Sequence, residues 1–188
     1  APFFKKLDLK NLTFAHDRDV PGEKLHFPAF AAGATGTSYD MAQFLLKLTK
    51  AHEDLEGSSG LSHDTAVEML FGNDKGSIEF MGASMGLGAF VAEAGNNKFA
   101  IHQGANEGFR ALYMQCFAGP DCGKGLVIFV RGEDEVVGFV AKVAQEFIKD
   151  LNIQYMDTKK FRSDFDYSKV SREQRVNLGY KEMTFEAF

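Results

Sequence analysis

Hydrophobic residues recur every three or four positions in three stretches of the chain, which is the period of one face of a helix. The first helix is expected after a glycine-rich turn, where Thr37 and Asp40 form a capping box. A second helix is expected from Ser62, which supplies a cap before an acidic first turn. The third and clearest helix is expected over residues 134–151. The apolar faces of the first and third helices consist of Met41, Phe44, Leu45 and Leu48, and of Val136, Val140, Val143 and Phe147.

Shorter apolar runs separated by turn residues predict strands between the second and third helices. Four strands are expected, over residues 86–92, 98–102, 109–117 and 124–131. A further short strand is expected within residues 5–14, where Leu7 and Leu9 alternate with charged residues. The order of two helices, several antiparallel strands and a long helix predicts an α+β fold, with helices packed on an antiparallel sheet.

The last of these strands is the most hydrophobic. Its continuous run from Leu126 to Val130 is typical of a strand that is buried on both faces and paired along both edges. One neighbour is expected to be the strand over residues 109–117, joined through a short turn. The other would come from a partner chain or from this chain's own termini, where residues 6–12 and 182–188 both alternate. An open edge with this composition would favour aggregation.

The composition narrows the class of protein. The chain has 188 residues, enough for one domain with a hydrophobic core. We expect this domain over residues 1–151, followed over 152–188 by a more charged, aromatic-rich tail or linker that packs on it. A net charge of −5 offers no electrostatic footprint for nucleic acid. The longest apolar run is too short to span a bilayer, so neither nucleic acid nor a membrane is an expected partner.

The two cysteines and one asparagine could be modified, depending on the compartment. Cys116 and Cys122 flank a short turn and could form a disulfide, and two free thiols are an equal alternative. Their spacing completes no zinc site with nearby histidines, so no metal is expected. Asn11 begins a glycosylation sequon, which matters only in a secreted protein. The chain starts at Ala1, which suits secretion after processing but equally suits a trimmed chain.

Residues 102–108, HQGANEG, place an imidazole and three glycines at the end of an expected strand. Glycine weakens a strand, so such a cluster marks a bulge, a tight turn or a close approach by a ligand or another backbone. On spacing alone the favoured interpretation is a glycine-rich bulge that carries a half-exposed histidine.

Three segments in order along the chain resemble the serine β-lactamase-like family, which includes class C β-lactamases, penicillin-binding proteins and esterases. Residues 31–48, AAGATGTSYDMAQFLLKL, are similar to a family segment that reads roughly Ala-Ala-Gly-Leu-x-Thr-Thr-x-x-Asp-Leu-Ala-x-Phe-Leu. Residues 85–90 and 101–113, MGLGAF and IHQGANEGFRALY, resemble its glycine-containing strand and third active-site motif. That motif is Lys-Thr-Gly in some members and His-x-Gly in many esterase-like relatives.

This resemblance implies a site at the glycine cluster. His102 and Ala105 would be the catalytic residues, His102 through its imidazole and Ala105 through a backbone amide that faces an oxyanion. Gly104 would let a substrate lie against the strand edge, and Gln103 and Asn106 would join it in binding. No cofactor is implied.

The resemblance covers about residues 14–151 and only the C-terminal part of the family's fold. The family's nucleophile lies in Ser-x-x-Lys, and no serine here has a lysine three residues later. The Tyr-x-Asn motif is also absent, and Ser38 and Ser62 are better interpreted as helix-start residues.

Three functions follow from this partial match. The chain is expected to be a subunit or fragment of a β-lactamase-like serine hydrolase, inactive alone, whose partner chain carries the nucleophile and the missing strands. The alternative is a noncatalytic protein that binds a small molecule with the same half-fold. That the isolated chain is itself a hydrolase ranks lowest.

Overall fold

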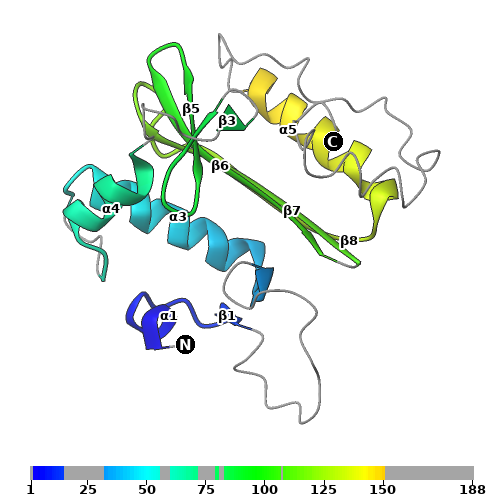
Figure 1. The fold of residues 1–188 in the computed structure, drawn as a ribbon, viewed down its shortest axis with the longest axis horizontal. Helices are drawn as coiled ribbons and strands as arrows, with labels where there is room; N and C mark the ends of the chain where they lie inside the picture. Colours follow the sequence, from blue (N-terminus) through cyan, green and yellow to red (C-terminus); the bar gives the residue numbers. More distant parts are fainter. Residues whose placement is uncertain are drawn as a thin grey trace. The chain divides into compact units, whose positions relative to one another are not determined.

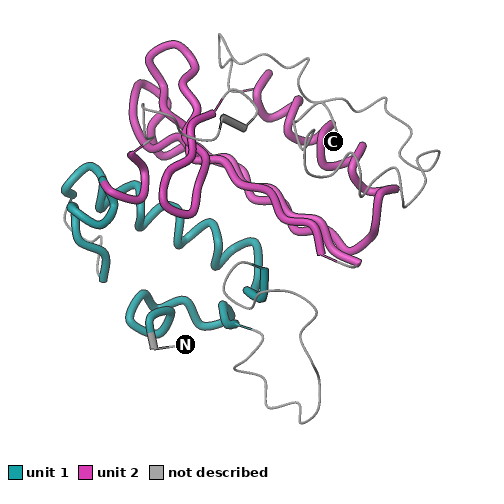
Figure 2. The backbone as a smooth tube through the Cα atoms, in the orientation of Figure 1, with its two compact units in different colours: residues 1–67 teal, residues 68–188 magenta. Residues whose placement is uncertain are grey.

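The computed structural model of the chain describes residues 2–14, 32–55, 60–71, 79–80, 83–106 and 108–150. The chain divides into two compact units, residues 1–67 and 68–188, which are coloured separately in Figure 2. The expected tail over 152–188 lies outside the described residues, so the division at residue 151 stays a prediction.

The first unit contains two short strands and a long helix. Its elements are α1 (Pro2–Lys6), β1 (Thr13–Phe14), β2 (Ala34–Thr35), α3 (Ser38–His52) and the start of α4 (His63–Leu70). The strand expected within residues 5–14 is wrong except for β1, which pairs antiparallel with β2. Leu7 and Leu9 are both buried, but their amides bond to the carbonyls of Phe3 and Phe4, so the chain continues the turns of α1. Alternate burial here results from a tight turn and does not indicate a strand.

The start of α3 confirms one half of the expected capping box. Thr37 Oγ1 accepts a hydrogen bond from the Asp40 amide at 3.1 Å. The Asp40 carboxylate instead accepts from the amide of Asn11 at 3.0 Å, which ties the turn before β1 to the helix. Leu45 and Leu48 are buried, as the helical pattern predicts. The expected cap at Ser62 is also present, because its hydroxyl accepts from the Thr65 amide at 3.2 Å.

The second unit is an antiparallel sheet with a helix on one face, so the predicted α+β class is confirmed (Figure 1). Its six strands follow one another in chain order, each paired with the next. They are β3 (Glu79–Phe80), β4 (Ala83–Met85), β5 (Phe90–Ala94), β6 (Asn97–Asn106), β7 (Phe109–Ala118) and β8 (Gly125–Arg131). A short 3₁₀ turn, η2 (Asp134–Val136), leads into α5 (Val137–Asp150), as expected for the third helix.

The core of this unit lies between α5 and the sheet. Ala141, Ala144 and Ile148 of α5 are buried against side chains from four neighbouring strands. The strand residues in this core are Ala94, Phe99, Ile101, Leu112, Met114, Cys116 and Ile128. Because side chains alternate along a strand, these residues define the α5 face of the sheet, and their neighbours point to the opposite face.

Two predicted strand boundaries are wrong in an informative way. The strand expected over residues 86–92 begins with a turn, in which the Gly86 amide bonds to the Ala89 carbonyl at 2.7 Å and Gly88 has a φ of 86°. The strand expected to end at His102 continues to Asn106 as β6. Pairing with β7 extends through the glycine-containing segment, so local propensity does not end the strand there.

Strand β8 differs from the expectation of burial on both faces. Ile128 is buried against α5, whereas Phe129, on the opposite face, is 42% exposed. Within the described part of the chain, β8 pairs only with β7 and forms one edge of the sheet. Of the two segments considered as neighbours for its other edge, residues 6–12 form the end of α1 and turns, and residues 182–188 lie outside the described residues.

Candidate functional site

The five site residues expected from the sequence, His102 to Asn106, occupy the last half of β6. Strand β5 pairs with β6 only as far as Ile101, where its partner is Phe90. Strand β7 continues to pair with β6 through Asn106. In the described sheet, β7 is therefore the strand paired with residues 102–106, which extend beyond the end of β5; we call this side of the segment its open edge, because no described strand pairs there.

The alternation of hydrogen bonds fixes which backbone groups face this edge. The Cys116 amide bonds to the Lys124 carbonyl, and the Gly123 amide bonds to the Cys116 carbonyl, so Cys116 bonds away from β6. Successive residues of an antiparallel strand bond to opposite sides, so Ala111 and its partner Gly104 bond to each other. The amide of Ala105 then points away from β7, toward the open edge. This is the direction that its expected role requires, and the role itself stays a prediction.

The imidazole of His102 lies between two aromatic rings. Its centroid is 5.9 Å from that of Phe90 and 6.0 Å from that of Tyr113, the latter ring being stacked at 23°. Burial lowers the pKa of His102 below its ordinary value of 6.5, and a hydrogen bond with the backbone of Gln103 opposes this only in part. The ring is therefore mainly neutral at pH 7, so one ring nitrogen can donate a hydrogen bond while the other accepts one.

The glycine at position 104 is not required by the fold. A Cβ atom built on it would meet the Cβ of Ala111 at 3.4 Å, which is an ordinary contact, and its φ is not positive. An alanine could therefore occupy the position without strain from the described residues. The absence of a side chain leaves the exposed backbone clear, as expected where another group approaches a strand closely.

The site residues divide between the two faces of the sheet. Phe99 and Ile101 of β6 point toward α5. Because side chains alternate along a strand, the side chain of His102 and the Cα hydrogen side of Gly104 face away from α5. Gln103 and Ala105 face the α5 side. The structure thus brings His102 and Gly104 together on one face and places the Ala105 amide at the strand edge between them and Asn106.

Two residues beside His102 were missed from the sequence, Phe90 and Tyr113. Tyr113 could have been found from the hairpin register, because pairing Asn106 with Phe109 also pairs His102 with Tyr113. Phe90 could not, because its contact depends on where β5 ends.

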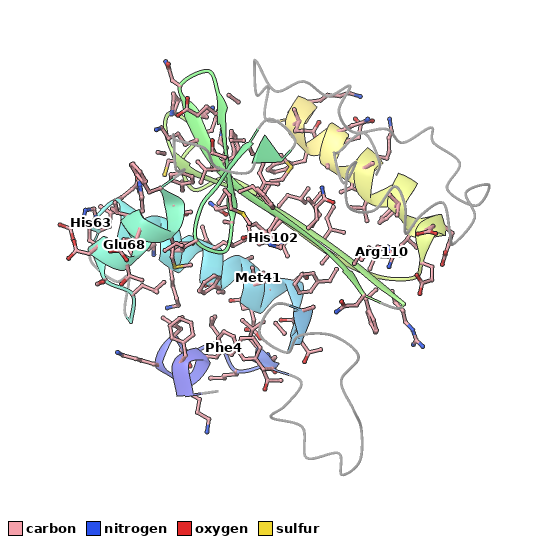
Figure 3. All side chains as sticks on the ribbon, in the orientation of Figure 1. Phe4, Met41, His63, Glu68, His102 and Arg110 are labelled. Atoms are coloured by element: carbon pink, nitrogen blue, oxygen red, sulfur yellow. The ribbon has the colours of Figure 1, made fainter. Side chains whose placement is uncertain are left out.

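Arg110 lies near the tip of the β6–β7 hairpin (Figure 3). Its side chain is only 11% exposed. Its guanidinium donates to the Asn106 carbonyl at 2.8 Å, to Glu133 Oε2 at 2.9 Å and to Asp134 Oδ1 at 3.1 Å. The Gly108 amide also donates to the Glu133 carboxylate. These bonds join the hairpin tip to the connection between β8 and α5 and so hold the end of the candidate edge in place.

Two expectations from the sequence concern covalent modification. Cys116 and Cys122 are free thiols in this structure, and burial raises the pKa of the Cys116 thiol to about 11. A disulfide between them under oxidising conditions stays a prediction. Asn11 is exposed in a turn, and its glycosylation is likewise untested.

Neither a metal centre nor a membrane span is evident in the part of the chain that the structure describes. No three histidine, cysteine, aspartate or glutamate side chains gather there in a way that could hold a metal ion. None of the helices described is both long enough and apolar enough to cross a bilayer.

Comparison with protein-family models, with curated proteins and with solved structures gives no match for this chain, so the interpretation of the site rests on its own geometry.

Proposed function

We propose that the chain is one subunit or fragment of a serine hydrolase of the β-lactamase-like type, and that residues 102–106 form one wall of its active site. The observation that supports this proposal is the open edge of β6, where the Ala105 amide points away from β7, on the same strand as the His102 imidazole. The partner chain would carry the nucleophilic serine and its lysine. The same proposal assigns this chain to the C-terminal part of the β-lactamase-like fold.

Each group has a definite role in acyl transfer. The serine oxygen of the partner attacks the carbonyl carbon of an ester or amide, and the electron pair of the C=O bond moves to its oxygen. The Ala105 amide stabilises that oxyanion, since a positioned donor lowers the energy of the charge that develops. His102 donates to a substrate carboxylate or hydrogen-bonds within the catalytic network. The serine proton passes to the base that the partner supplies with the nucleophile. As the C=O bond re-forms, the bond to the alcohol or amine breaks, and that base gives the proton to the leaving group.

The test uses the native assembly and a fluorophosphonate probe, which labels activated serines. We expect labelling on a chain other than this one and no adduct on the isolated chain. We expect His102→Ala in the assembly to slow labelling about 10-fold, as for loss of one hydrogen bond in the catalytic network. His63→Ala is the matched control, because His63 lies at the start of α4 outside the sheet, and its loss should leave the rate unchanged. A probe adduct on a serine of this chain, or a rate unaffected by His102→Ala, would reject the proposal.

A noncatalytic role in small-molecule binding is the second candidate, favoured by the absence of Ser-x-x-Lys. It predicts a native sample that contains this chain alone and binds a carboxylate ligand. That binding should be lost in His102→Ala and kept in His63→Ala.

A further inference from the structure

The outer edge of β8 is the largest apolar strand edge without a neighbouring strand among the described residues. Its seven residues, Gly125–Arg131, pair with β7 on the other side. Since Cys116 bonds to Lys124, the alternation along β7 directs the amides of Leu126 and Ile128 to β7. The amides of Val127 and Phe129 then point outward. Such a row of backbone groups is a template for an added strand.

The side chains at one end of β8 define the chemistry of that strand. Phe129 and Arg131 are two residues apart, so they lie on the same face, opposite α5. Phe109, the cross-strand partner of Arg131, lies beside them and is 57% exposed. Within the described residues Arg131 has no ion-pair partner, whereas Lys124 at the other end of β8 is paired with Asp121 at 2.6 Å. The open corner therefore combines exposed aromatic surface with one unpaired positive charge.

A second copy of this chain fits the edge poorly. Antiparallel pairing of two β8 strands about Ile128 would match apolar residues with apolar residues. It would also set Arg131 opposite Gly125 of the other copy at each end of the pair, so no acidic side chain would lie directly opposite Arg131. An acidic side chain at that position would be favourable instead.

We propose that β8 binds an extended strand of the partner chain, and that this strand places an apolar side chain beside Phe129 and an acidic side chain beside Arg131, two residues apart. This inference rests on the proposed function in one respect: the added strand is assigned to the same partner chain that carries the nucleophile. Binding to β8 itself does not involve His102.

The proposal is tested on the full chain with two peptides that differ in one residue. The first is an acetylated and amidated heptapeptide, Thr-Val-Thr-Val-Thr-Glu-Thr, and the second has lysine in place of glutamate. Binding is followed by the amide NMR signals of Val127 and Phe129. We expect the glutamate peptide to bind roughly threefold to tenfold more tightly, and Arg131→Glu to reverse this preference. Phe129→Thr should weaken both peptides, whereas Phe71→Thr, at an exposed aromatic after α4, should weaken neither.

Three outcomes would overturn the inference: equal affinity of the two peptides, shifts confined to other strands, or an Arg131-dependent dimer of the chain alone. Peptide binding in His102→Ala separates this proposal from the proposed function. That variant should bind the glutamate peptide as well as the wild type does, whatever the fluorophosphonate experiment shows.

Discussion

At the residue scale, the charge state of His102 depends on the rings around it. Desolvation by burial is the main cause of its lowered pKa, and the rings of Phe90 and Tyr113 lie next to the imidazole. We expect an NMR titration of the imidazole protons to give a pKa below 6.5, and Phe90→Ala to move it back toward 6.5 because the ring gains contact with water. Phe71→Ala is the control, since Phe71 is exposed and outside the sheet, and it should leave the titration unchanged. A wild-type pKa at or above 6.5 would contradict this account.

The same burial makes folding sensitive to mild acid. In the unfolded chain His102 has its ordinary pKa of 6.5, and in the folded chain the pKa is lower. Between these two values the unfolded state binds more protons, so the free energy of unfolding falls as the pH drops. The contribution of neutral His102 to the free energy of unfolding is fully present above pH 6.5. It is lost as the pH falls through the lowered pKa of the folded state. We expect urea unfolding between pH 7 and 5 to show a steeper loss in the wild type than in His102→Gln; identical slopes would exclude His102 as the cause.

At the element scale, the β6–β7 hairpin depends on the bonds of Arg110. Arg110→Met would leave the Asp134 carboxylate partly buried without its guanidinium, so we expect a loss of about 1–3 kcal/mol in the free energy of unfolding. The amide of Gly104, which bonds to Ala111 of β7, should also exchange faster as the hairpin tip loosens.

Lys98→Met is the matched control for Arg110→Met. Lys98 pairs with Glu93 at 3.1 Å, but both side chains are largely exposed, so removing that pair should cost about 0–1 kcal/mol. Equal effects of the two substitutions in chemical denaturation would show that the Arg110 bonds do not hold the hairpin.

The sequence pattern predicted helices better than strand ends. The cap at Thr37 and the apolar face of α5 depend on residues three or four apart, so local order alone identifies them. The end of β6 depends on pairing with β7, and glycine at position 104 concealed the continuation of the strand. The contact of Phe90 with His102 also joins separate strands. Such contacts between strands cannot be deduced from periodicity, and they determine much of the candidate site.

At the scale of the whole molecule, the apolar composition of β8 led to a wrong prediction of burial on both faces, and the reason is physical. A continuous run of apolar residues was interpreted as burial on both faces, but α5 covers one face only, and Phe129 on the other is exposed. Among the described residues β8 has a strand neighbour, β7, on one side only. Whether another strand pairs with its outer edge stays a prediction.

Hydrogen exchange distinguishes a lone edge strand from one that is covered in the assembly. In the isolated chain we expect the amide of Ile128, bonded to β7, to exchange slowly, and the amides of Val127 and Phe129, which point outward, to exchange quickly. In the native assembly all three should be slow, because an added strand accepts hydrogen bonds from the outward amides. If Val127 and Phe129 already exchange slowly in the isolated monomer, this chain covers its own edge and the partner strand is not needed. If they stay fast in the assembly, the partner binds elsewhere.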